Sequence, residues 1–487
     1  MEKYGMVTVT VITRDNNQIF QCEEGSNLLE QCMKQGIDIP HHCNKKGTCG
    51  FCKVMIKGDN APISKEEEKL FSKEELKKGY RLCCKQRVTS DVTVDITCKV
   101  QKEERVLLSN VLHESDLKAM DELGFAVDIG TTTVAVALMN LTTKEVVDEI
   151  GFSNPQRTFG ADVTARISYG SQKEGLAVME KEIKKAIHEA VETLLKRQKL
   201  ASTCQLKKMA IAANPTMLHI LQGFSTKSLG EYPFTPVSLS YEVYSYQELF
   251  GESELSMEVE LLPGFSSFVG ADILAGVLYV NMDQSEKKQL FIDLGTNGEM
   301  IIGEKGRMIS TSCAAGPAFE AAFKSQGLHG SRMIDLMAQY KNARFIDEEG
   351  TIIPRYFEKG IPCQNGVSLT QSMIREIQLA KSAVRTGIDI LAKEYGCNLK
   401  EIEQVYLAGG FGFHLKLKAA YEIGLLPKEF AGKVQVVGNT SILGAKGWLE
   451  QEDYKERAKA VVEWVKNINL ANHKDFHKLF VEHMKLR

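Results

Sequence analysis

Several features that mark common classes of protein are scarce in this sequence. No stretch approaches the roughly 18 consecutive apolar residues of a membrane-spanning helix, so we expect no membrane association. The first residues, MEKYGMVTVTVITRD, lack the basic and apolar regions of a signal peptide. The 60 Lys and Arg nearly balance the 63 Asp and Glu and form no basic arm, which argues against nucleic acid as a partner. The sequence therefore predicts a cytoplasmic protein without low-complexity segments.

Cysteine is also scarce over most of the chain. Of the twelve cysteines, eight lie within the first 98 residues and only four follow them. In a reducing compartment this asymmetry favours a metal or redox site over a disulfide framework. The cysteines thus predict one small domain with its own chemistry.

The first residues have the pattern of a small α+β domain. Residues 6–13 and 91–97 alternate β-branched and polar side chains, as strands do. The segment SNLLEQCMKQG has helical spacing, and we expect Ser26 to cap this helix and Gly36 to end it. Strands around one helix would complete the domain.

Composition divides the chain into three parts. We expect a small α+β domain at 1–98, a charge-rich linker with a short helix at 99–122, and an α/β domain at 123–487. Long amphipathic segments such as 176–199 alternate with hairpin patterns in the third part. The last stretch, 452–487, has helical spacing with Trp464, Phe476 and Phe480 as anchors, so we expect it to dock on the core.

Three cysteines have the spacing of a cluster-binding loop. Cys43, Cys49 and Cys52 form C-x5-C-x2-C, with Gly47 and Gly50 between them. Such a loop wraps its backbone closely around sulfide ions, which glycine permits. A cluster of two irons needs a fourth thiolate, and the segment RLCCKQ at 81–86 offers two candidates, Cys83 and Cys84.

At these residues the sequence resembles the [2Fe–2S] ferredoxins of the β-grasp fold. In that family the last ligand lies in an Arg-Leu-small-Cys segment, so the resemblance implies Cys84 as the fourth ligand and Cys83 as its small neighbour. The alternative is a zinc site or buried free thiols, but zinc usually takes paired C-x2-C hooks. We expect Cys22, Cys32 and Cys98 to be core residues.

Two further segments place an acidic residue and a Gly-Thr turn after an apolar strand. The first is Asp128-Ile-Gly130-Thr131-Thr132, and the second is Asp293-Leu-Gly295-Thr296-Asn297. Backbone amides in such turns can bind phosphate oxygens, and the carboxylate can hold hydrated Mg²⁺. Their surroundings, 125–140 and 291–306, are alike, so the sequence predicts two hairpins of repeated chemistry that bind a triphosphate together.

A third segment, VYLAGGFGFH at 405–414, places a Gly-Gly-Phe turn after a strand. The missing side chains of Gly409 and Gly410 would let an adenosine lie against backbone, with Phe411 following. We expect GNTSILGAK at 438–446 to begin a helix at the same cleft.

These three segments, in this order, resemble the phosphate and adenosine motifs of the actin, sugar kinase and Hsp70 superfamily. The resemblance implies a duplicated, ribonuclease H-like α/β ATPase domain, with Asp128 and Asp293 as the catalytic carboxylates at Mg²⁺. It also implies a set of ATP contacts at Gly130, Thr131, Thr132, Gly295, Thr296, Asn297, Gly409, Gly410 and Phe411.

Nearly the whole chain resembles the reductive activators of corrinoid proteins. Besides the motifs above, the resemblance includes NPQRTFGADVTARI at 154–167, NPTMLHILQG at 214–223, FVGADILAGVL at 268–278 and CAAGPAFEAA at 313–322. It implies an electron passing from a [2Fe–2S] cluster to a Co(II) corrinoid protein of a methyltransferase system, at the expense of ATP. The implied partners are that corrinoid protein and an upstream low-potential electron donor, and a homodimer is left open. Because Asp128 follows the linker almost at once, we expect this chain to lack the middle domain of larger members.

Two other functions remain as alternatives. One is an electron-injecting activase of an acyl-CoA dehydratase or reductase, although such activases lack a ferredoxin domain. The other is a small-molecule kinase with a redox-sensing domain, although no segment has an evident catalytic base. The polar residues of the resembling segments fit helix capping or core contacts as well as a functional role; they are Asn154, Asp162, His219 and Asp272.

Overall fold

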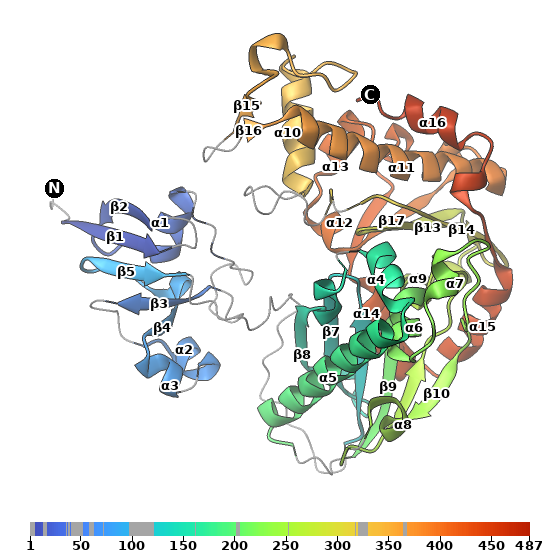
Figure 1. Cartoon of the computed structure of the whole chain (residues 1–487), viewed down its shortest axis with the longest axis horizontal. Coiled ribbons are helices and arrows are strands. Elements are labelled where there is room, and N and C mark those ends of the chain that lie inside the picture. Colours follow the sequence, from blue (N-terminus) through green and yellow to red (C-terminus); the bar gives the residue numbers. More distant parts are fainter. Residues whose placement is uncertain are drawn as a thin grey trace. The chain divides into compact units, whose positions relative to one another are not determined.

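The computed structural model describes most of the chain (Figure 1). The described residues are 5–12, 17–35, 37, 39, 52–57, 63–71, 73–96, 121–160, 162–200, 205–251, 253–316, 318–319, 330–363 and 368–487. The chain separates into two compact units, Met1–Leu112 and His113–Arg487. This division falls inside the segment 99–122, where we expect a linker. The short helix predicted for that segment lies outside the described residues.

The first unit is a five-stranded mixed sheet with helices, in the strand order β2-β1-β5-β3-β4. Alternate residues of β1 are buried, namely Val7, Val9 and Val11, which is the period-2 pattern that predicted this strand. β1 pairs in parallel with β5 and antiparallel with β2. The bounds are β1 Met6–Ile12, β2 Asn17–Glu23, α1 Leu28–Lys34, β3 Lys53–Lys57, α2 Lys65–Leu70, α3 Lys73–Lys77, β4 Tyr80–Leu82 and β5 Val92–Asp95.

The predicted cap of α1 is wrong by one residue. The side chain of Asn27 accepts a hydrogen bond from the Glu30 amide at 3.2 Å, so Asn27 is the N-cap. The Ser26 hydroxyl instead donates back to the Glu23 carbonyl in the preceding turn. Ser and Asn are both good caps, and the local turn decides which side chain reaches the helix. Gly36 lies outside the described residues.

The second unit contains two six-stranded sheets. The first has the order β10-β11-β9-β6-β7-β8, and the second has the order β18-β17-β12-β13-β14-β19. The bounds in the first sheet are β6 Leu123–Ile129, β7 Thr133–Asn140, β8 Glu145–Ser153, β9 Leu206–Ala213, β10 Glu242–Ser245 and β11 Glu258–Leu261. Those in the second are β12 Gln289–Leu294, β13 Gly298–Glu304, β14 Arg307–Cys313, β17 Gln404–Ala408, β18 Val434–Gly438 and β19 Val465–Asn467, and β15 Ile361–Pro362 pairs with β16 Ser368–Leu369 apart from them.

The two large sheets share one topology. In each, three consecutive strands form an antiparallel meander, β6-β7-β8 or β12-β13-β14. In each, the first strand of the meander then pairs in parallel with a later strand, β9 or β17, and that strand pairs with β11 or β18. The two predicted hairpins are therefore confirmed as corresponding parts of a duplicated fold.

Helices surround these sheets (Figure 1). The segment 176–199, predicted as a long helix, lies almost wholly in α5. The bounds are α4 Val163–Gly170, α5 Lys173–Arg197, α6 Pro215–Leu221, α7 Lys227–Gly230, α8 Tyr246–Phe250, α9 Ala271–Tyr279, α10 Gly330–Asn342, α11 Gln371–Tyr395, α12 Gly410–His414, α13 Leu417–Glu422, α14 Thr440–Glu450, α15 Tyr454–Trp464 and α16 Phe476–Glu482. Within the described ranges, no helix has the length and apolar character needed to cross a membrane.

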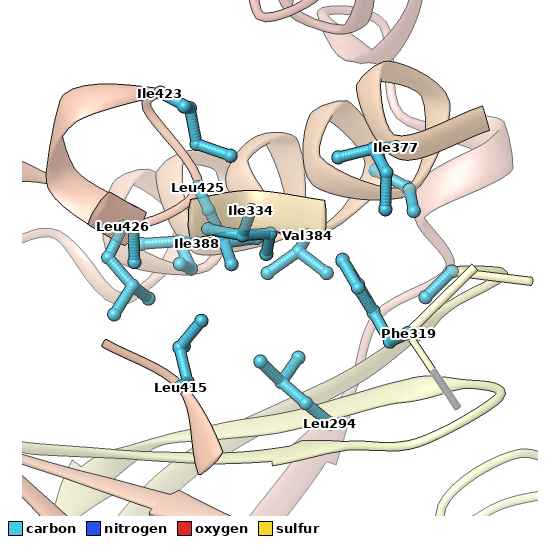
Figure 2. Close-up of a cluster of buried hydrophobic side chains, with 14 of the residues drawn as sticks. Leu294, Phe319, Ile334, Ile377, Val384, Ile388, Leu415, Ile423, Leu425 and Leu426 are labelled. Carbon is cyan, nitrogen blue, oxygen red and sulfur yellow. The ribbon is translucent and has the colours of Figure 1, made fainter. Parts of the chain in front are cut away.

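A large apolar core supports the end of β12. Figure 2 shows Leu294, the last residue of that strand, beneath side chains from α10, α11 and the segment after α13. Ile334, Val384 and Leu425 in this core are fully buried. Burying each such side chain contributes about 1.5–3 kcal/mol, so the strand end that carries Asp293 rests on a rigid support.

Helix α14 connects the second half of the unit to the first sheet. It packs closely on α9 because Gly444 has no side chain: a Cβ there would lie 2.2 Å from the Ala275 carbonyl oxygen. Lys446 of α14 also forms a buried ion pair with Glu149 of β8 at 2.7 Å. The N-terminus of α14 is thereby held against the strands of the first sheet.

The end of the chain is docked, as predicted. Phe476 and Phe480 of α16 pack against the core beside α11. Leu486 is fully buried, and its amide donates to the Glu348 carbonyl at 2.7 Å. The predicted single helical stretch is divided into α15 and α16, because β19 pairs with β14 between them.

Candidate functional site

Two of the four predicted cluster cysteines are described, and they lie together. Cys52 immediately precedes β3, and Cys84 lies in the short 3-10 helix Cys83–Lys85. Their sulfur atoms are 3.2 Å apart, and both side chains are buried. Two thiolates on one tetrahedral metal lie about 3.7 Å apart for metal–sulfur bonds of about 2.3 Å, so the pair needs only a small shift to bind one iron. Cys43 and Cys49 lie outside the described residues.

Backbone and side-chain hydrogen bonds hold the Cys84 segment in place. The Asn27 side chain, which caps α1, also donates to the Cys84 carbonyl at 2.9 Å. The Cys83 amide donates to the Cys52 carbonyl at 2.8 Å. The two cysteine segments are therefore fixed to one another and to α1.

A buried carboxylate spans the same segment. Glu67 of α2 is fully buried, and one of its oxygens accepts from the Leu82 amide and from the Gln86 side chain, each at 2.8 Å. Its other oxygen accepts from the Ser64 amide at 2.8 Å in a capping box. Because Leu82 and Gln86 flank Cys83–Lys85, Glu67 fixes the conformation that presents Cys84.

The neighbouring thiols have a different environment. The side chain of Cys83 forms a hydrogen bond with Cys32 of α1, and both residues are fully buried. Cys22 is also buried, so the predicted core role of Cys22 and Cys32 is confirmed. Cys98 lies outside the described residues.

The first Gly-Thr turn begins at Asp128, in the buried strand β6. Its carboxylate accepts from the Asn439 side chain at 2.8 Å and from the Ser441 hydroxyl at 2.7 Å. Burial raises the pKa of Asp128, and these two hydrogen bonds oppose that shift. Since Asn439 caps α14 and Ser441 lies in its first turn, the predicted helix at 438–446 reaches the first turn directly.

Three polar side chains contact this turn: one directly follows β8, one lies in α4, and one directly follows β9. Asn154 donates to the Gly130 carbonyl at 2.8 Å, and Arg166 donates to the Thr131 carbonyl at 2.6 Å. Asn214 donates to the Thr131 hydroxyl at 3.2 Å. The turn therefore has a fixed orientation.

The second turn lies next to the Gly-Gly segment. Asp293 of β12 pairs with Ala408 of β17, and the Gly295 amide donates to the Asn297 carbonyl at 2.9 Å. A Cβ on Gly409 would lie 2.6 Å from the Asp293 carboxylate, and Gly409 has a φ of +89°, so both space and conformation require glycine here. The predicted phosphate and adenosine segments are brought together.

Phe411 lies in the core. Its ring is buried and stacks on Phe319 with centroids 4.5 Å apart. Gly410 starts α12, and a Cβ there would meet nothing within 4 Å, so this glycine leaves space beside the turn. The backbone at Gly410 is therefore accessible to a ligand, and the buried Phe411 ring fixes this segment to the core.

Two further carboxylates belong to this region. Burial and the nearby Asp128 raise the pKa of Asp272, in the first turn of α9, to about 7. Burial, Asp272 and Asp293 raise the pKa of Glu299 in β13 well above its usual value. Carboxyl groups from both turns therefore share one electrostatic environment.

The sequence left four polar residues between a structural role and a functional one, and the structure separates them. Asp162 caps α4 through the Ala165 amide at 2.8 Å. His219 is a satisfied core residue, since one ring nitrogen is 2.7 Å from the Pro215 carbonyl and the other accepts from the Val237 amide. Asn154 caps a short helix and also holds the first turn, and Asp272 is near enough to Asp128 for the two carboxylates to interact electrostatically.

No metal group is complete among the described side chains. In the ranges that the structure covers, no three Cys, His, Asp or Glu residues converge closely enough to hold a metal ion. The buried Cys52–Cys84 pair could supply two of the four thiolates of a [2Fe–2S] cluster. The Asp128 carboxylate could bind Mg²⁺ through the water molecules around that ion. A cavity of about 1010 Å³ lies elsewhere, lined by Lys341, Arg355 and other residues between 341 and 359.

Comparison with known families identifies both parts of the chain. A family model for the 2Fe-2S iron-sulfur cluster binding domain matches residues 11–89. The model of the RACo middle region matches 123–285, and that of the C-terminal domain of RACo, the ASKHA domain, matches 287–329 and 322–487. ASKHA denotes the actin, sugar kinase and Hsp70 type of fold.

Similar proteins match over most of their length. The corrinoid activation enzyme RamQ of Eubacterium limosum is 27% identical over 74% of this chain and 69% of its own. The [Co(II) methylated amine-specific corrinoid protein] reductase of Methanosarcina barkeri is 25% identical over 71% of this chain and 72% of its own. A solved structure of a reductive activator for a corrinoid, iron-sulfur protein has the same fold, with a TM-score of 0.67 at 24% identity over 99% of this chain and 98% of its own.

The fold and its sites define a two-part class of protein, in which a [2Fe–2S] β-grasp domain is joined to an ASKHA ATPase domain. Within that class, the chain belongs to the RACo family, the reductive activators of corrinoid proteins.

The match corrects our expectation that a middle domain is absent. The RACo middle region corresponds to residues 123–285, which hold β6 to β11 and the first Gly-Thr turn. The sequence alone suggested an omission because Asp128 directly follows the linker. The middle region is instead the first half of the duplicated fold.

Sequence reasoning missed several residues that support these sites. Arg166 contacts the first turn from α4, and Glu67 of α2 contacts the residues on either side of Cys83–Lys85. Glu299 lies in β13, just after the second turn, and interacts electrostatically with Asp293. A polar residue within an otherwise apolar helix face was the available signal for Arg166. No local pattern identifies Glu67, because Ser-x-x-Glu capping boxes also occur away from any site.

Proposed function

We propose that this chain reactivates a corrinoid protein of a methyltransferase system by reducing its cobalt from Co(II) to Co(I) in a reaction that needs ATP. The observation that carries the proposal is the presence, in one chain, of the buried Cys52–Cys84 pair and of two Gly-Thr turns whose carboxylates are linked electrostatically through Asp272 and Glu299. The names of its relatives support the same substrate class.

The first unit would hold the [2Fe–2S] cluster through Cys43, Cys49, Cys52 and Cys84. When bound, the cluster supplies one electron at a time. Asn27 and Glu67 keep the Cys84 segment rigid, which lowers the reorganisation that accompanies a change of charge. Cys84 would be the fourth ligand: its sulfur lies 3.2 Å from that of Cys52, whereas the Cys83 side chain forms a hydrogen bond with Cys32, and both observations support this choice.

The second unit would bind Mg²⁺-ATP between the two turns. Asp128 and Asp293 would orient the hydrated Mg²⁺, the Gly130–Thr132 and Gly295–Asn297 turns would bind phosphate, and Gly409 and Gly410 would face the adenosine. Asn439 and Ser441 would keep the Asp128 carboxylate oriented. Since Asp128 and α14 come from opposite ends of the unit, ATP binding there can change how the two halves pack.

ATP is needed because the Co(II)/Co(I) couple is difficult to reduce. For one electron, each tenfold preference for one oxidation state shifts a potential by about 59 mV. A conformational change that alters how tightly each oxidation state of the partner is bound can supply a preference of several powers of ten. Hydrolysis would then release the reduced partner.

The proposal extends to the surroundings of the reaction. An upstream low-potential donor would reduce the cluster, and the protein would act in the cytoplasm. A homodimer stays a prediction from the sequence alone.

The test is reduction of a Co(II) corrinoid protein, followed by the absorbance of Co(I). We expect Co(I) to form only when the chemically reduced protein and Mg²⁺-ATP are both present. Full-rate reduction without ATP would contradict the proposal and would indicate a ferredoxin-type reductase that does not need ATP. A phosphorylated small molecule as product would favour the kinase alternative.

A further inference from the structure

Arg166 is a fully buried cation in the first turn of α4. Its guanidinium donates to the Thr131 carbonyl at 2.6 Å, to the Gly160 carbonyl at 3.0 Å and to the sulfur of Met217 at 3.3 Å. All three acceptors are uncharged. Burial lowers the pKa of Arg166 to about 10, so the side chain still carries its charge at neutral pH.

Arg166 and Asn154 bind successive carbonyls of the first Gly-Thr turn. The Asn154 side chain donates to the Gly130 carbonyl at 2.8 Å, Arg166 donates to the Thr131 carbonyl, and the Asn154 amide donates to the Thr132 carbonyl at 2.9 Å. In a trans peptide the N–H points away from the C=O of the same unit. The Thr131 and Thr132 amides are thus directed to the opposite side of the turn, in the arrangement that binds anions.

We propose that Arg166 is a positioning residue for the phosphates of the bound nucleotide, which it influences through the Thr131 carbonyl and through its charge. This inference rests on the proposed function, namely that the second unit binds ATP. It adds a role that belongs to α4 and to none of the three motif segments.

The energetics favour this role over plain packing. The three hydrogen-bond acceptors of Arg166 carry no charge, and the nearby Asp162 offsets the cost of burying the guanidinium only in part, since the positive charge of Arg157 opposes it. A negatively charged ligand would add compensation for this buried charge. A triphosphate on the far side of the turn would supply it, because the Thr131 peptide lies between the two charges and its dipole is aligned with both.

The experiment compares ligands with and without phosphates. Calorimetry would measure Mg²⁺-ATP and adenosine binding to full-length wild type, Arg166→Met and Arg166→Lys. We expect Arg166→Met to bind ATP at least tenfold more weakly and adenosine with unchanged affinity, and its ATP affinity to depend less on salt. Arg166→Lys keeps the charge without the planar fork and should lie between the two.

Arg157→Gln is the matched control. Arg157 is an exposed arginine of the same segment that donates to the Ser153 hydroxyl, and its loss should leave ATP affinity within twofold. Equal ATP affinity of Arg166→Met and wild type would overturn the inference, and so would an equal loss of ATP and adenosine binding. If Arg166→Met does not fold, the ATP-to-adenosine ratio of Arg166→Lys decides in the same way. Failure of wild type to bind ATP would contradict the proposed function instead.

Discussion

At the scale of single residues, neighbours decide what a cysteine does. Cys83 and Cys84 are adjacent and both buried, yet one bonds with Cys32 of α1 and the other faces Cys52 across 3.2 Å. Sequence position alone cannot separate them, because a 3-10 turn directs successive side chains to different sides.

This difference predicts opposite outcomes for two substitutions. Cys84→Ala should remove most of the visible absorption of the cluster, because only three thiolates remain for two irons. Cys83→Ala should retain the spectrum and lose only about 1–2 kcal/mol of stability from the core. Absorption and iron content per chain measure both effects, and loss of the cluster in Cys83→Ala alone would transfer the ligand role to Cys83.

Asp272 predicts a pH dependence of stability in the nucleotide-free, metal-free protein. Its pKa is about 7 in the folded state, because of burial and of Asp128, and about 3.9 when unfolded. Between these values the folded state binds more protons, so this group makes stability fall as pH rises from about 4 to 7.

Asp272→Asn should remove that fall. At pH 8 we expect the variant to be more stable than wild type, by on the order of 1–2 kcal/mol, and at pH 4 the two should be alike. Urea unfolding at several pH values in the presence of a chelator measures the difference. A constant difference between the proteins from pH 4 to pH 8 would contradict the prediction.

At the scale of elements, short contacts at helix ends connect segments that are distant in sequence. The start of α14 holds Asp128, the start of α4 carries Arg166, and the end of the chain docks on α11. In the last case Gln378 donates to the Met484 carbonyl at 2.6 Å, Lys381 donates to the Lys485 carbonyl at 2.7 Å, and Ser382 donates to the Phe480 carbonyl. Buried polar groups of α11 thus satisfy carbonyls at the end of the chain.

Lys381 predicts a pH dependence of the opposite sign. Burial, with Arg385, Lys341 and Arg487 nearby, lowers its pKa to about 7 from a usual value near 10.5. Between these values the unfolded state binds more protons, so stability should rise with pH, by on the order of 1–3 kcal/mol from pH 7 to pH 10. Lys381→Met should lack this rise in denaturant unfolding. Lys393→Met, on the exposed part of the same helix, is the control and should keep it.

At the scale of the whole molecule, the two predicted sites lie in different units. All described residues of the predicted cluster site lie in Met1–Leu112, and all described residues of the predicted nucleotide site lie in His113–Arg487. Each unit has its own apolar core. The two activities should therefore be separable by mutation, although cobalt reduction needs both.

Two substitutions test this separation. Asp128→Ala should lower ATP hydrolysis by about two orders of magnitude or more, since a carboxylate at the Mg²⁺ is lost, and leave the cluster spectrum intact. Cys52→Ala should remove the cluster and leave ATP hydrolysis within about twofold. Both variants should fail to form Co(I). Normal ATP hydrolysis by Asp128→Ala would contradict the assignment of the nucleotide site.

The sequence by itself determined the parts with local signatures. The C-x5-C-x2-C spacing, the two Asp-x-Gly-Thr turns and the Gly-Gly-Phe segment each depend on a few neighbouring residues, so they can be read along the chain. Alternation in β1 and the long apolar period of α5 determined these elements in the same way. The repeat of the two hairpins also followed, because both halves of the fold retain the same pattern.

Tertiary structure alone decided which distant residues meet. The pairing of Asp128 with Asn439 and Ser441 spans more than 300 positions, and the contacts of Arg166 with Thr131 and of Glu67 with Leu82 cross between elements. The choice of Asn27 over Ser26 as a cap, and the core position of Phe411, depended on a local turn and on the packing of Phe319. These outcomes follow from burial and hydrogen bonding between residues that meet only in the folded chain. A local sequence pattern does not indicate such contacts.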